Sequence, residues 1–149
     1  MKETCRITRE EFNAETGETT VTITTDFGSF TGVTKIDGID AEYPSLFHGY
    51  EIASAKAHRK WARAMKVIIR EKMRALNSII KQMPNCANPQ PGSHEAQLVR
   101  KEYEAAVEEY ELWSRREIAM TESIKNRIKA RDMIMLRYAQ AKENSDKTE

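Results

Sequence analysis

The stretch PNCANPQPG, Pro84 to Gly92, decides how this 149-residue chain folds. All six glycines and all four prolines lie at or before Gly92, so the last 57 residues contain no helix breaker. Ser93 follows as a helix N-cap, and Glu95 falls in the first turn of the helix that it would start. The pattern predicts a turn at 84–92 and a long helix after it.

The 33 residues from Glu51 to Met83, upstream of this turn, also contain no glycine or proline, and as a helix they span about 50 Å. Their apolar residues recur every three or four positions, at Ala55, His58, Ala62, Met65, Ile69, Met73, Leu76, Ile80 and Met83. A second stripe follows the turn, at Val99, Tyr103, Ala106, Tyr110, Trp113, Met120, Ile124, Ile128, Met135 and Tyr138. Two amphipathic helices joined by a short turn predict an antiparallel helical hairpin. Glu117 interrupts the second stripe, so we expect that helix to break or bend near 114–117, or to overhang the first.

The first fifty residues follow a different period. In VTITTDF, Val21, Ile23, Thr25 and Phe27 alternate with threonines, which predicts a half-buried strand. Segments 5–12 and 29–36 flank it across turn sequences and complete an antiparallel meander of about three strands. We therefore expect an α+β fold, with the meander and a connecting loop at 1–49 and the helical hairpin at 50–149, packed as one domain.

Composition excludes several classes of protein. The longest apolar runs are three or four residues and the N-terminus is charged, so we expect no membrane span, no signal peptide and a place in the cytoplasm. Cys5 and Cys86 lack metal-ligand spacing, and the three histidines are scattered. No motif supplies a nucleophile or a paired acid and base. We expect a non-enzymatic protein with no cofactor and no metal.

Charge is distributed unevenly along the chain. Residues 1–50 have a net charge of −5, residues 51–100 of +7 and residues 101–149 of −1, although the total is only +1. The residues one position after the apolar positions of the first helix form a row without acids, in which seven are basic: Lys56, Arg59, Arg63, Lys66, Arg70, Arg74 and, after Asn77, Lys81, with Lys60 nearby. Such a row forms a basic ridge beside the packed seam, because successive residues lie about 100° apart round a helix.

Two readings of this ridge follow from the antiparallel pairing. The acidic residues at the start of the second helix neutralise part of it, at Glu102, Glu104, Glu108, Glu109 and Glu111. Segment 56–63, by contrast, is expected to face the basic segment 125–131, which concentrates positive charge at that end of the hairpin. The residues predicted to bind a partner are Lys56, Arg59, Arg63, Lys66, Arg70, Lys125, Arg127, Lys129 and Arg131.

Three partners are compatible with this charge: an acidic or nucleic-acid-binding groove of another protein, a nucleic-acid backbone, and the chain's own acidic sheet. A further alternative is self-association, because an overhanging second helix leaves Met133, Met135 and Tyr138 to be covered by the sheet or by another subunit. The sequence leaves all of these open.

Residues 29–64, SFTGVTKIDGIDAEYPSLFHGYEIASAKAHRKWARA, resemble a group of small proteins encoded by phages and prophages of Gram-positive bacteria. The similar elements are the strand FTGVTK, an acidic loop with a serine, a glycine entering a helix, and a basic helix, here at Asp40, Glu42, Ser45, Gly49, Ile52, Ala53 and Ala57. Where members have a second basic residue before the helix alanine, this chain has Lys56, which keeps the charge but not the bidentate geometry. The resemblance extends loosely over about three quarters of the chain. It implies a phage origin and no catalytic residues, and by analogy a protein that binds and modulates or inhibits a host or defence protein.

Overall fold

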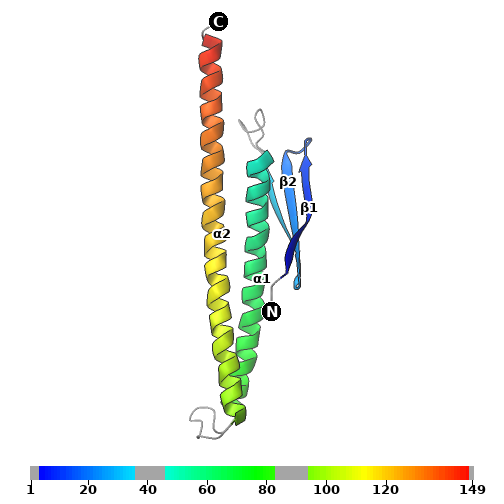
Figure 1. The fold of residues 1–149 in the computed structure, drawn as a ribbon, viewed down its shortest axis with the longest axis vertical. Coiled ribbons are helices and arrows are strands. Elements are labelled where there is room, and N and C mark those ends of the chain that lie inside the picture. Colours follow the sequence, from blue (N-terminus) through cyan, green and yellow to red (C-terminus); the bar gives the residue numbers. More distant parts are fainter. Residues whose placement is uncertain (1–3, 36–45, 83–93, 148–149) are drawn as a thin grey trace. The chain divides into compact units, whose positions relative to one another are not determined.

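The computed structural model describes residues 4–35, 46–82 and 94–147. Three strands precede two long helices, as Figure 1 shows, in the predicted α+β arrangement of an antiparallel meander and a helical hairpin. The elements are β1 (Cys5–Asn13), β2 (Glu18–Thr25), β3 (Gly28–Lys35), α1 (Leu46–Gln82) and α2 (His94–Lys147). The predicted turn at 84–92, the cap at Ser93, Met83, Cys86 and the connecting segment 36–45 lie outside the described residues.

The sheet has the strand order β1-β2-β3, and both pairs are antiparallel. Val21 and Ile23 of β2 are fully buried, and burying each such side chain contributes about 1.5–3 kcal/mol. Phe27, expected on the same buried face, is instead 55% exposed. It lies in the turn between β2 and β3, because Gly28 adopts a φ of 126° and the chain reverses there.

The contacts of the chain divide it into two compact units. The first unit combines Met1–Trp61 with Ile118–Glu149, and the second is Ala62–Glu117. Each unit contains a part of both helices, so this division crosses the hairpin and does not separate the sheet from it.

In the first unit, α1 packs on the sheet through residues with little or no side chain. A Cβ atom on Gly32 of β3 would lie 1.9 Å from the carbonyl oxygen of Ala53 in α1. A Cβ atom on Gly49 would lie 2.8 Å from Oγ1 of Thr19 in β2. Gly49 stands within α1, which begins at Leu46 and therefore starts earlier than the predicted Glu51. The backbones of helix and sheet therefore touch at Gly32, and at Gly49 the side chain of Thr19 packs directly on the helix backbone.

The opposite side of α1 in the first unit packs against α2, so α1 lies between the sheet and α2 there (Figure 1). Ile52 and Ala55 form a buried cluster with Ile124, and Met120 and Ile128 pack against its margin. Four of the five belong to the predicted stripes, and Ile52 lies three residues before Ala55, where the first stripe begins. The period of the sequence therefore identified this seam.

The second unit contains the continuation of both helices. Its buried side chains include Met65, Ile69 and Leu76 of α1, and Ala96, Ala106 and Trp113 of α2. Of the three alternatives for the second helix, a break, a bend or an overhang, the break near 114–117 does not occur, because α2 is one helix from His94 to Lys147. The Ser114 hydroxyl donates to the carbonyl of Tyr110 at 2.9 Å, a local bond that the helix accommodates. In the part of the chain that the structure describes, neither helix is apolar enough to cross a membrane.

Candidate partner-binding surface

Lys56 of the predicted ridge and the neighbouring Lys60 lie on the open edge of the sheet. The Lys56 amine donates to the carbonyl of Val33 at 3.1 Å, and the Lys60 amine donates to the carbonyl of Thr31 at 2.6 Å. β3 is an edge strand, because only β2 pairs with it among the described residues. Unpaired edge carbonyls are a site for unwanted strand pairing, and lysines that cover them protect the edge. Each bond uses one of the three N–H donors of the ammonium group, and neither lysine forms an ion pair within the described residues.

Positive charge is concentrated around Lys56. Burial lowers the pKa of its amine, and the neighbouring charges of Arg59, Arg131 and Lys60 lower it further. We call Lys56, Arg59, Lys60 and Arg131 the basic cluster. The Nε atom of Arg59 is buried and has no hydrogen-bond partner. The predicted meeting of like charges from both helices is therefore present in the first unit.

The predicted register of the two helices is nevertheless wrong. Segment 125–131 was expected to face 56–63, but Arg127 forms an ion pair with Glu51, one turn before Lys56. The Nε of Arg127 also donates to Oγ of Ser123 at 3.1 Å. Arg127 is therefore a structural link between α1 and α2 and has no free charge to offer a partner.

The other predicted cations of α2 have different surroundings. Lys125 and Lys129 are exposed and make no ion pair or hydrogen bond within the described residues. They lie about 160° round the helix from Arg127, on the far side of α2 from Glu51. The Arg131 side chain is only 13% exposed, with its Nε 3.6 Å from a carboxylate oxygen of Asp132.

In the second unit, the ridge is largely neutralised. Glu117 lies 3.7 Å from Nε of Arg63 and 3.8 Å from Nζ of Lys66. The guanidinium of Arg70 donates to the Tyr110 hydroxyl at 2.6 Å. The guanidinium of Arg70 and the amine of Lys66 both lie over the Tyr110 ring. The sequence predicted neutralisation but assigned it to the wrong acids: Glu102, Glu104, Glu108, Glu109 and Glu111 are exposed and make no ion pair within the described segments.

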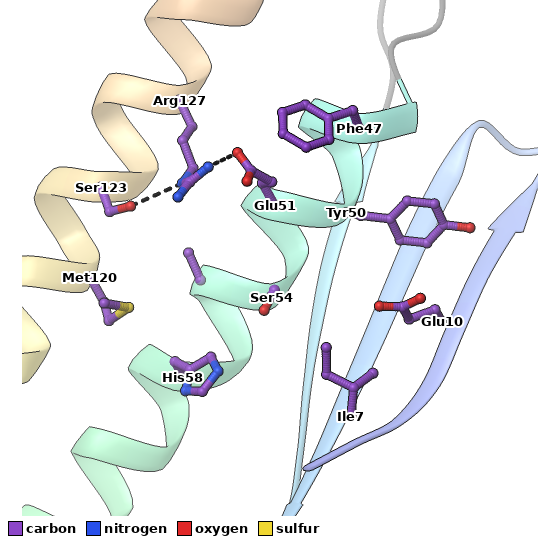
Figure 2. A pocket seen from close by; sticks show the side chains of 11 residues that line it. Ile7, Glu10, Phe47, Tyr50, Glu51, Ser54, His58, Met120, Ser123 and Arg127 are labelled. Atoms are coloured by element: carbon purple, nitrogen blue, oxygen red, sulfur yellow. Dashed lines mark hydrogen bonds and ion pairs between the residues drawn. The ribbon is translucent and has the colours of Figure 1, made fainter. Parts of the chain in front are cut away.

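Sequence reasoning missed a groove in the first unit, which Figure 2 shows. It encloses about 370 Å³ between β1, α1 and α2. We call this "the groove" and define it by its lining: Ile7, Glu10, Phe47, Tyr50, Glu51, Ser54, Ala55, His58, Met120, Ser123 and Arg127. Ile7 is 52% exposed and Phe47 66% exposed, so apolar surface faces solvent there.

The α1 side of the groove can be predicted from the sequence if the start of α1 is known. Phe47, Glu51, Ser54 and His58 recur at spacings of four, three and four, which places them on one side of a helix. The sequence assigned Phe47 to a connecting segment and did not link it to Ile7. Burial lowers the pKa of His58, so the neutral imidazole is favoured in the groove.

The three residues predicted for self-association lie in different environments. Met135 is buried at 6% exposure, whereas Met133 and Tyr138 are each 55% exposed. The neighbouring Ile134 and Leu136 are also exposed, at 47% and 53%. Uncovered apolar surface is therefore present on this part of α2, but Met135 does not contribute to it.

Among the described residues, no three His, Cys, Asp or Glu side chains come together as metal ligands. The chain matches no protein-family model, and comparisons with curated proteins and with solved structures found no match either.

Proposed function

We propose that this chain is a non-enzymatic interaction protein that binds an acidic surface of another protein through cations of the first unit: the basic cluster and, on the side of α2 that faces away from Glu51, Lys125 and Lys129. The observation that supports this is the concentration of like charge around Lys56, whose pKa is lowered first by burial and then by the charges of Arg59, Arg131 and Lys60. Like charges held together cost free energy, which an anionic partner returns when it binds.

The contacts of the other residues predicted to bind a partner exclude four of them from the binding surface. Arg63, Lys66 and Arg70 contact Glu117 or Tyr110, and Arg127 contacts Glu51, so these four are occupied within the chain. Arg59, Lys125 and Lys129 make no ion pair in the described part of the chain. These three are the residues that we expect to meet the partner first.

The resemblance to phage and prophage proteins suggests that the partner belongs to the infected cell, and that binding modulates or inhibits a host or defence protein. Small proteins without active-site chemistry act by occupying surfaces of larger ones, and a nucleic-acid-processing complex has anion-binding and acidic grooves to occupy. The host or defence protein is inferred as the partner by analogy with those phage proteins.

The test is a pull-down from a lysate of a Gram-positive host with the tagged full chain, run with and without nuclease treatment and read by mass spectrometry. We expect one protein in stoichiometric amount, lost when Lys125→Glu and Lys129→Glu are combined. The matched control combines Lys72→Glu with Lys101→Glu, exposed lysines outside the surface, and should keep the partner. Retention of the partner by the first double variant would show that the surface is wrong.

Nucleic acid is the alternative ligand, and the same pull-down distinguishes it from a protein partner. If every partner disappears with nuclease, the cluster binds phosphates and the protein-partner proposal fails. Binding to naked duplex should then weaken steeply with salt, since each neutralised phosphate releases counterions.

A further inference from the structure

The groove has one carboxylate that nothing in the described residues neutralises. Glu51 is paired with Arg127, and the dashed lines of Figure 2 mark that pair and the bond from Arg127 to Ser123. Glu10, on β1, is exposed and makes no ion pair within the described residues. An occupant that suits the groove therefore has apolar side chains and a cation next to them.

The same unit presents such a surface on α2. Ile134 and Tyr138 are 47% and 55% exposed and follow Arg127 by seven and eleven residues. At 100° per residue, both lie within about 20° of Arg127 round the helix, on the side that lines the groove. Arg137 lies between them in the sequence and about 80° round the helix from Arg127. It is exposed and makes no ion pair in the described part of the chain.

We propose that the groove receives Ile134, Arg137 and Tyr138 of a second copy of this chain, with Arg137 paired to Glu10. The two surfaces are complementary in charge, since one has an unneutralised carboxylate and the other an unneutralised guanidinium. Both also expose apolar side chains that association would cover.

The spacing along α2 allows each of the two copies to fill the groove of the other. Ser123, which lines the groove, and Arg137 are each seven residues from Ala130. If two α2 helices pack antiparallel about a two-fold axis at Ala130, Arg137 of one copy lies beside Ser123 of the other, and the reverse holds. Both grooves fill at once, which closes the assembly as a dimer. The partner-binding lysines 125 and 129 lie on the far side of α2, so this inference does not depend on the proposed function.

The test is sedimentation equilibrium of the full chain over roughly a hundredfold range of concentration, because dimerisation follows mass action. We expect a species of twice the 17.2 kDa chain mass. Glu10→Arg and Arg137→Glu should each raise the dimer dissociation constant by about tenfold or more, since each places like charges together. Ile134→Glu should give a monomer, whereas the matched control Leu136→Glu, on the other side of α2, should dimerise like the parent.

Mixing the two charge variants tests directly whether residues 10 and 137 pair across the dimer. A heterodimer of Glu10→Arg with Arg137→Glu has one reversed pair and one original pair, so the mixture should associate more tightly than either variant alone. Far-UV circular dichroism confirms that each variant is folded. A parent chain that stays monomeric, equal loss of dimer in Ile134→Glu and Leu136→Glu, or a mixture that does not associate would each overturn the proposal.

Discussion

The backbones of Gly32 in β3 and Ala53 in α1 are in direct contact, because a Cβ atom on Gly32 would lie 1.9 Å from the Ala53 carbonyl oxygen. The backbone nitrogen of Ala57 would lie only 2.7 Å from the same atom. Both obstacles are main-chain atoms of a helix, which do not move aside as a flexible side chain does. The size of residue 32 therefore sets the distance between sheet and helix.

Gly32→Ala should lower the free energy of unfolding by about 3 kcal/mol, because the added methyl group forces β3 away from α1. Urea unfolding followed by far-UV circular dichroism measures this. The control is Ser29→Ala, an exposed position of the same strand, where we expect a loss within about 1 kcal/mol. Equal stability of Gly32→Ala and the parent would mean that helix and sheet do not meet at this point.

Most of the fold was predictable from the sequence because the apolar period fixes which face of each element is buried. The alternation around Val21 and Ile23 identified β2, and the spacing of Met65, Ile69 and Leu76 identified the seam of α1. These side chains are buried wherever the elements pack, so no knowledge of the partner element is needed.

The register of the hairpin was less predictable, because it depends on particular pairs across the seam. Charge alone suggested that segment 125–131 faces 56–63, but the Glu51–Arg127 pair sets a different alignment. The exposure of Phe27 was missed for a similar reason: the turn geometry of Gly28, and not the strand period, decides where that ring lies.

Lys60→Met should destabilise the first unit by about 0.5–1 kcal/mol, since its hydrogen bond to the Thr31 carbonyl is solvent-exposed and contributes modestly. The larger effect should appear as aggregation, because the edge of β3 becomes available to another strand. Light scattering during heating measures the onset of aggregation, and urea unfolding measures the stability.

The matched control for this change is Lys72→Met, an exposed lysine of α1 with no hydrogen bond in the described residues. Lys72→Met changes charge and hydrophobicity as much as Lys60→Met does, but it leaves the sheet edge covered. If both variants aggregate at the same temperature, general surface hydrophobicity explains the effect and edge protection by Lys60 does not.

The candidate surface was predictable in composition but not in detail. Helical spacing placed Lys56, Arg59 and Lys60 near one another, and their effect on the pKa of Lys56 agrees with that. The sequence did not distinguish Lys129, which stays exposed, from Arg127, whose charge Glu51 takes up. Ion pairs depend on atomic distances of a few ångströms, which periodicity does not specify.

His58 should make stability depend on pH. Burial lowers the pKa of its imidazole below the ordinary 6.5, and the other ionisable groups lining the groove are Glu10, Tyr50, Glu51 and Arg127. The unfolded chain binds a proton at this residue more readily than the folded chain does. The contribution of His58 is therefore fully present above pH 6.5 and is lost as the pH falls through the lowered folded-state pKa.

The measurement is urea unfolding of the parent and of His58→Gln between about pH 8 and pH 5, a range that brackets the pKa of histidine. The two remaining histidines are common to both proteins, so their titration cancels in the difference. We expect the stability of the parent relative to His58→Gln to be constant above pH 6.5 and to fall below it. A difference that stays constant to pH 5, or that grows as the pH falls, would show that protonation of His58 is not disfavoured in the folded state.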